Sequence, residues 1–143
     1  AAEAINKARV EVAEQEKLGP ISVEDLLAEA NEIGDVRVIV AETRGANQNV
    51  MRQLIDQLRK RFSPVAVLLG ASQGEDKVTL VAGLSRELVE QGHNAGDWVR
   101  ATAQLVGGGG GGKPDMAQAG GKYPEKLAAA LNAARKQMTE QLG

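Results

Sequence analysis

Apolar residues recur along this chain with two spacings, which predict helices and strands in different segments. In residues 47–62 they return every three or four positions, as on one face of an amphipathic helix, and Asn47 stands where a capping side chain is expected. The same spacing predicts helices over residues 94–106 and 124–142, and a short helical stretch that ends at Glu90. We therefore expect a chain with several amphipathic helices.

Three other segments have the length and the β-branched, apolar composition of strands: residues 36–41, 65–69 and 77–82. The turn residues at 73–76 place the second and third strands in a hairpin, whereas the helix at 47–62 separates the first strand from the second. Strands interspersed with helices in this way predict an α/β fold. We expect a small mixed β-sheet flanked by helices.

The first 34 residues have a different pattern. Residues 1–18, rich in Ala, Glu, Lys and Gln, carry a thin apolar stripe that predicts a helix packed on a neighbour or continuing a coiled coil. A near capping box at Ser22 begins a second helix, which we expect to end at Gly34. We therefore expect the chain to have two parts: an N-terminal helical, coiled-coil-like extension over residues 1–34 and a globular α/β domain over residues 35–143.

Composition excludes several classes of protein. The chain has no cysteine, which excludes disulfide scaffolds, thiol redox chemistry and the usual zinc fingers. No apolar run approaches the roughly 20 residues of a membrane-spanning helix, and the N-terminus lacks a signal pattern. We expect a cytoplasmic protein with no membrane partner. Because the helical pattern begins at Ala1 rather than after an initiator methionine, we also expect a piece of a longer protein.

The net charge of −2 is unevenly spread along the chain. Residues 1–35 hold three basic and nine acidic residues, whereas residues 36–122 hold eleven basic and eight acidic ones. A modestly basic body is suited to phosphates, but a mixed, solvated surface explains the same numbers. Charge alone leaves both explanations open.

The most unusual segment is a run of six glycines, Gly107 to Gly112, which leads into Lys113-Pro114-Asp115. Ordering such a run loses much conformational entropy, and its bare backbone can approach a ligand and turn N–H groups toward an anion. A flexible linker is the alternative, but the constrained segment that follows and the position between two helices favour an ordered or ligand-ordered loop. No strand precedes the run and no Gly-Lys-Ser/Thr opens the next helix, so an ATP site is not expected.

The side chains around this loop are candidates for contact with phosphate. Arg86 follows a strand and Arg100 lies on the helix that leads into the loop, so both could meet phosphate. Each alone is more often a solvated surface charge, and the case for them depends on convergence with Lys113 and Lys122. Asp115 could hydrogen-bond a ribose or base, or brace the loop itself. Trp98 is expected in the core. The candidate nucleic-acid-binding residues are Arg86, Arg100, Gly107, Gly108, Gly109, Gly110, Gly111, Gly112, Lys113, Asp115, Gln118, Gly120, Gly121 and Lys122; no catalytic or metal-binding residue is expected.

The segment from Gly107 to Gly121 resembles the glycine-rich signature near the end of bacterial alanyl-tRNA synthetases. Three segments upstream are also arranged as in that family: Gly34-Asp35-Val36, Arg86-Glu87-Leu88 and Asn94-Ala95-Gly96. The resemblance therefore covers about residues 20–143. It implies the glycine-rich, DHH-associated type of C-terminal domain in that family. The helix at residues 1–18 would then be the end of a coiled-coil connector.

The resemblance implies a non-catalytic domain that holds tRNA at its elbow, so that aminoacylation and editing sites elsewhere in the parent ligase can use it. Its implied partners are tRNA and the other domains of the parent. The implied cofactors of the parent are ATP, magnesium and zinc, and none is expected in this fragment. The family's zinc-binding editing site needs a His-x-x-x-His pair and a cysteine, whereas His93 is the only histidine here.

Two other functions remain open at this point. A shorter form of the loop, with a histidine after the glycines, occurs in the substrate-binding accessory domain of DHH phosphoesterases; Lys113-Pro114 stands in its place here. A homodimerisation module is the other alternative. The apolar stripe that would serve it on the last helix consists of Leu127, Leu131, Met138 and Leu142.

Overall fold

The computed structural model describes residues 26, 28, 30–43, 46–62, 64–73 and 76–142. The helix predicted over residues 1–18 lies outside these residues, as does most of the helix predicted to start at Ser22. Leu26 is helical and is buried against the core. The division into an extension over residues 1–34 and a domain over residues 35–143 stays a prediction.

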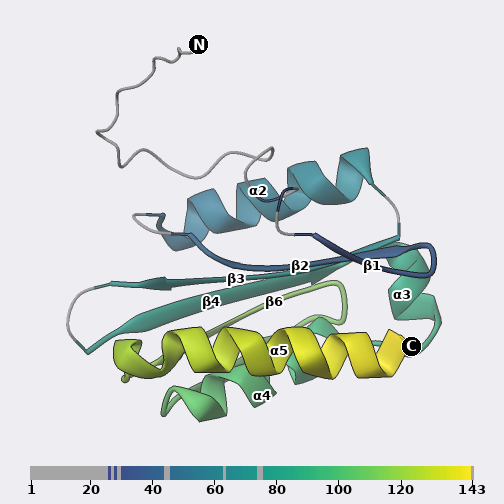
Figure 1. Ribbon diagram of the computed structural model, residues 1–143. Helices are drawn as coiled ribbons and strands as arrows, with labels where there is room; N and C mark the ends of the chain where they lie inside the picture. Colours follow the sequence, from purple (N-terminus) through teal and green to yellow (C-terminus); the bar gives the residue numbers. More distant parts are fainter. Residues whose placement is uncertain are drawn as a thin grey trace.

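Six strands form one sheet, and helices cover both of its faces (Figure 1). The strands are β1 (Asn31–Ile33), β2 (Val36–Glu42), β3 (Val65–Ser72), β4 (Val78–Leu84), β5 (Gly109–Gly112) and β6 (Met116–Gly121). The helices are α2 (Gln48–Arg61), α3 (Arg86–Glu90), α4 (Ala95–Leu105), the 3-10 turn η1 (Pro124–Lys126) and α5 (Leu127–Leu142). The predicted helices and the three predicted strands of the α/β domain are confirmed, with shifts of a few residues at their ends.

The strand order β1-β2-β3-β4-β6-β5 makes the sheet mixed. Strands β2 and β3 are parallel, joined by a crossover through α2, and all other neighbours are antiparallel. Figure 1 shows α2 on one face and α4 with α5 on the other. The predicted α/β fold with a small mixed sheet flanked by helices is confirmed, as is the hairpin of β3 and β4.

The side chains of the central strands alternate between two hydrophobic clusters, as the period of a strand requires. In β2, Val38 and Val40 join the cluster beneath α4 and α5, whereas Ile39 and Ala41 join the cluster beneath α2. Trp98 of α4 is 1% exposed, and its indole N–H donates to the carbonyl of Ala134 at 3.0 Å. The expected core position of Trp98 is therefore confirmed, and the indole ties α4 to α5.

The prediction that a helix continues to Gly34 is wrong for Asn31–Ile33, which form strand β1. Ile33 pairs with Val36 across the two-residue turn Gly34-Asp35, and Gly34 has a φ of +60°. A glycine with positive φ is typical both of a helix end and of a tight hairpin turn. The sequence pattern was consistent with either structure, and pairing with β2 decides between them.

The apolar stripe on α5 belongs to the core of the domain. Leu127, Leu131 and Met138 are buried against the sheet and α4, at 2%, 5% and 0% exposure, and Leu142 packs partly buried on the same cluster. Since these side chains already have partners within the domain, the stripe gives no support to a homodimer formed through it.

Candidate nucleic-acid interface

The prediction that the glycine run is a loop is wrong for Gly109–Gly112, which form strand β5 at the edge of the sheet. Gly109 pairs with Gly120 and Gly112 with Ala117, so β5 and β6 form an antiparallel hairpin whose turn is Lys113–Asp115. A run of glycines has no side chains that could alternate between apolar and polar, so the sequence pattern did not predict a strand here. The neighbouring strand β6, itself paired with β4, supplies the hydrogen-bond partners that order the run.

The first two glycines close helix α4. Gly107 has a φ of +75°, and its N–H donates to the carbonyl of Gln104 at 3.3 Å. The N–H of Gly108 donates to the carbonyl of Ala103 at 2.9 Å. This pair of bonds is the Schellman arrangement, which satisfies the last carbonyls of a helix and favours glycine at the left-handed position. The start of the run thus has a structural role.

Gly108, Gly110 and Gly112 have no room for a β-carbon, because the backbone of β6 approaches them closely. A β-carbon on Gly110 would lie 2.5 Å from the Cα atom of Ala119, and one on Gly108 would overlap the carbonyl of Gly120. A β-carbon on Gly109, by contrast, would meet no atom within 4 Å. The packing of the hairpin therefore accounts for much of the run without any ligand.

Arg100 lies against the outer edge of β5. Its Nε donates to the carbonyl of Gly110 at 3.2 Å, one terminal nitrogen is 3.1 Å from the carboxylate of Asp97, and the guanidinium sits beside Gly111. Edge strands leave backbone groups unpaired, and Arg100 satisfies one of them. The structure thus brings Arg100 and the glycine strand together, as the candidate site requires.

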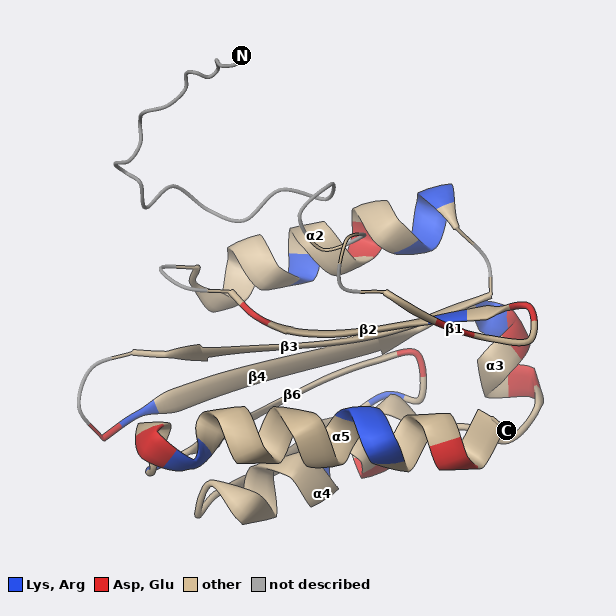
Figure 2. Ribbon diagram, in the orientation of Figure 1, with Lys and Arg blue, Asp and Glu red and all other residues tan. Residues whose placement is uncertain are grey.

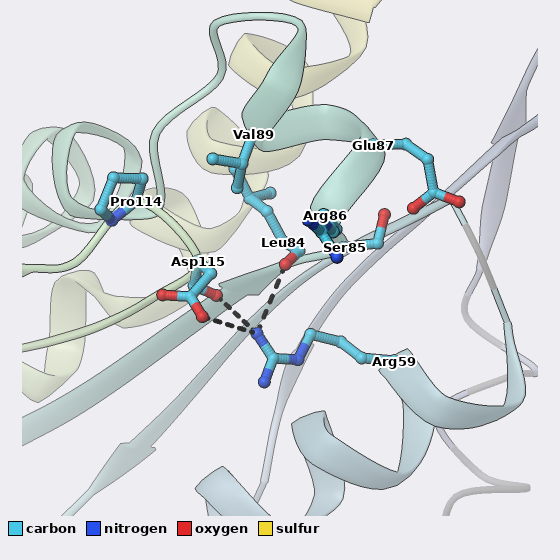
Figure 3. Close-up of a pocket in the computed structure, with 8 residues that line it drawn as sticks. All are labelled: Arg59, Leu84, Ser85, Arg86, Glu87, Val89, Pro114 and Asp115. Carbon is cyan, nitrogen blue, oxygen red and sulfur yellow. Dashed lines mark hydrogen bonds and ion pairs between the residues drawn. The ribbon is translucent and has the colours of Figure 1, made fainter.

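Arg59 of α2 holds the turn of the hairpin, a contact that sequence reasoning missed (Figure 3). One of its terminal nitrogens donates to the carbonyls of Asp115 at 2.9 Å and Leu84 at 3.4 Å, and lies 3.7 Å from the carboxylate of Asp115. The other nitrogen is 2.9 Å from Asp56. Helical spacing puts Arg59 four residues after buried Ile55, at the border of the face that meets the sheet, which was the available signal.

Two hollows of about 450 and 540 Å³ meet at this turn and share Arg59 and Asp115. The first has the glycine strand as one wall, and the second, drawn in Figure 3, lies against α3. We call their polar and glycine lining the turn-end surface: Arg52, Asp56, Arg59, Ser85, Arg86, Glu87, Gly111, Gly112, Lys113, Asp115 and Gln118. Six of these eleven residues belong to the predicted site; the other five are Arg52, Asp56, Arg59, Ser85 and Glu87.

The rest of the predicted site lies on α4, at its end, or elsewhere on the hairpin. Lys122 follows Gly121 at the open end, next to Gly107, whereas Lys113 is at the turn. At about 3.3 Å per residue, the six-residue β6 alone separates the two lysines by roughly 20 Å. The two lysines thus flank the run in sequence without converging in space.

Cations of the turn-end surface differ in their pairing. Arg86 is 89% exposed and forms an ion pair with Glu90 at 3.4 Å, and Arg59 is paired as described. The side chains of Arg52 and Lys113 are exposed and make no hydrogen bond or ion pair with the described residues. Both signs of charge are interspersed over the helices in Figure 2, so no single helix is uniformly basic. Arg52 and Lys113 are the cations most available to a ligand.

We expect Arg59→Met to lower the free energy of unfolding by about 1–3 kcal/mol, because it removes charged hydrogen bonds that satisfy two carbonyls and Asp115. Arg52→Met, about two turns away on the same helix, should change it by less than about 0.5 kcal/mol, because the exposed Arg52 has no partner among the described residues to lose. Urea unfolding of both variants measures the difference. Equal destabilisation would contradict the role given to Arg59.

The described residues include no group of three or more His, Cys, Asp or Glu side chains placed to hold a metal ion. In the same part of the chain, no helix combines the length and the apolar character that crossing a membrane requires.

The chain is similar to known proteins over most of its length. Residues 35–140 match the family model described as the DHHA1 domain. An alanine–tRNA ligase from Rhodopirellula baltica is 60% identical over 126 residues, which are 87% of this chain and 13% of that protein. One from Bacillus subtilis is 43% identical over 115 residues, 80% of this chain and 13% of that protein. The matched segment is thus a small part of each of these relatives.

Two solved structures are similar to this one. The crystal structure of the C-Ala domain from Aquifex aeolicus alanyl-tRNA synthetase matches with a TM-score of 0.66 and 32% identity, over 79% of this chain and 96% of that chain. A member of the s1p family of ribosomal proteins with a DHH domain matches with a TM-score of 0.58 and 16% identity, over 96% of this chain and 33% of that chain. At that identity, the second likeness shows a shared fold only.

Proposed function

The chain belongs to the DHHA1 domain family and, within it, to the C-Ala domains of alanyl-tRNA synthetases, and on this premise we propose that it binds tRNA through the turn-end surface. The domain holds tRNA at its elbow while aminoacylation and editing take place in other parts of a longer, cytoplasmic ligase. The domain performs no chemical step. ATP, magnesium and zinc would act in those other parts, and the domain itself takes no cofactor.

The observation that carries the proposal is the glycine edge strand, which leads into a turn fixed by Arg59 beside two unpaired cations. Gly111 and Gly112 line the hollow through their backbone, because Arg100 and Ala117 occupy the space that a β-carbon would need. Arg52 and Lys113 border the same hollow and are free to bind phosphates. Arg59 keeps the turn in place before any ligand arrives, which reduces the entropy lost on binding.

Such a surface recognises shape and the positions of phosphates rather than base sequence. Most of its donors are cations and backbone groups, which contact phosphate and sugar in any sequence. We expect the affinity for tRNA to fall with salt, with a log–log slope of about 0.7–0.9 for each phosphate contact. tRNAs of different sequence should bind with similar affinity.

The test is titration of the 143-residue chain with a tRNA transcript over a salt series. A minihelix that keeps the acceptor and T arms but lacks the D arm serves as the control, because it cannot form the elbow. We expect tRNA to bind more tightly than the minihelix at every salt concentration. No binding at low salt would refute the proposal, and equal affinity for both RNAs would refute recognition of the elbow.

A further inference from the structure

The open end of the hairpin, opposite the turn-end surface, carries an exposed aromatic ring. Tyr123 is 43% exposed, and Leu105, at 48%, is the other large apolar side chain exposed among the described residues. Trp98, by contrast, lies wholly in the core. A half-exposed tyrosine ring points to a possible contact, because part of a large apolar surface remains in water.

The backbone holds this ring in a fixed place. The N–H groups of Lys122 and Tyr123 both donate to the carbonyl of Val106, at 2.7 and 3.1 Å. The ring also rests on Gly107, where a β-carbon would overlap it. The tyrosine is therefore anchored to the end of α4 from two sides, and a ligand that meets it finds the ring already positioned.

Two lysines flank the ring. The Nζ atom of Lys126 lies 5.1 Å from the centroid of the Tyr123 ring, and Lys122 is the adjacent residue in sequence. A cation over an exposed ring is held more weakly than a stacked nucleobase, so a base can displace this flexible ammonium. The ammonium is then free to approach a neighbouring phosphate.

The charges at this end of the domain favour RNA only slightly. The pairing of Val78 with Gly121 brings Asp76 and Lys77, at the start of β4, near the same end. Lys77, Lys122 and Lys126 are then opposed by Asp76 and Glu125, the described acidic residues next to them along the chain. The exposed ring of Tyr123, rather than the local net charge, is therefore the reason to expect a nucleobase here.

We propose that Tyr123 stacks on an unpaired nucleobase of RNA, with Lys122 and Lys126 on the phosphates beside that base. Proteins that read RNA loops use aromatic rings in this way, because unstacked bases expose a flat face. The inference rests on the proposed function and adds a second point of contact to it. Since the six-residue β6 separates this point from Lys113 by roughly 20 Å, the two contacts engage different nucleotides.

The test compares Tyr123→Leu with Tyr123→Phe in titrations of the 143-residue chain with a tRNA transcript. Tyr123→Leu should weaken binding by about tenfold at every salt concentration and leave the log–log salt slope unchanged, because stacking releases no counterions. Tyr123→Phe keeps the ring and should bind as tightly as the unaltered chain. Lys122→Gln/Lys126→Gln should instead reduce the slope by about 1.4–1.8.

A blunt RNA duplex with no unpaired base is the control ligand, and Tyr123→Leu should not change its affinity. Urea unfolding checks that the variant remains folded. Stacking on an unpaired base is wrong if Tyr123→Leu binds tRNA as tightly as the unaltered chain. It is also wrong if the variant loses affinity for tRNA and for the duplex to the same extent. The proposed function survives either result, whereas an unaltered chain that binds no tRNA overturns both.

Discussion

Gly108→Ala should destabilise the domain by about 2–4 kcal/mol, the largest effect we expect from adding a single methyl group. The new β-carbon would overlap the carbonyl of Gly120, which belongs to the backbone of the partner strand and has no flexible side chain that could move aside. The hairpin would have to open or shift relative to α4. The measurement is the urea midpoint of unfolding at unchanged m-value.

Gly109→Ala is the matched control, since it makes the same change one residue further along. Its β-carbon would meet no atom within 4 Å, and Gly109 is not among the glycines with positive φ. We expect no destabilisation, and a gain of up to about 1 kcal/mol is possible because alanine has fewer unfolded conformations. Similar losses in the two variants would contradict the packing of β5 on β6.

Arg52→Gln/Lys113→Gln should weaken tRNA binding by about 100-fold at low salt. Each side chain lacks a partner within the described residues, so its loss removes a charged contact to phosphate without disturbing the fold. A charged hydrogen bond contributes about 1.5 kcal/mol or more, which is roughly tenfold in affinity for each cation. The magnitude of the log–log salt slope should fall by about 1.4–1.8.

Lys136→Glu is the control for this pair, because it changes the net charge by the same two units. Lys136 is exposed on α5, which covers the other face of the sheet from α2. If only net charge mattered, Lys136→Glu would lower the affinity as much as the double variant. An equal loss in the two variants would exclude a localised site at Arg52 and Lys113.

The helices of the domain could be predicted closely because each has a local signal. Asn47 and Asn94 cap α2 and α4 through their side chains, which accept from Val50 at 2.9 Å and Asp97 at 3.1 Å. Such caps and the apolar spacing of three and four depend only on nearby residues. The central strands were also found, because their apolar runs are as long as buried strands require.

The edges of the sheet could not be predicted in this way. Strand β5 consists of glycine alone, and β6 of Met116 followed by small and polar residues, so neither shows the alternation of a half-buried strand. The structure of β6 is decided by pairing with β4, which lies more than thirty residues earlier in the chain, and that of β5 by pairing with β6. Hydrogen bonding between distant strands thus overrides the weak strand propensity of these two segments.

The candidate site was predicted in part for the same reason. Gly111, Gly112 and Lys113 meet at one hollow because they are consecutive, whereas Lys122 could be excluded from it only once β6 was known to be extended. Arg59 contacts Asp115 across 56 positions of sequence, a separation that no local pattern reports. Long-range contacts of this kind need the fold itself.

The central claim is that tRNA binds at the turn end of the glycine hairpin, and backbone amide chemical shifts during titration with a tRNA transcript test it most directly. We predict the largest changes at Gly110 to Lys113, at Gln118 and at Arg52, with smaller ones at Tyr123. The amides around Lys136 on α5 should remain unchanged. Changes concentrated on α5 and β1, with the amides of β5 unmoved, would contradict the account.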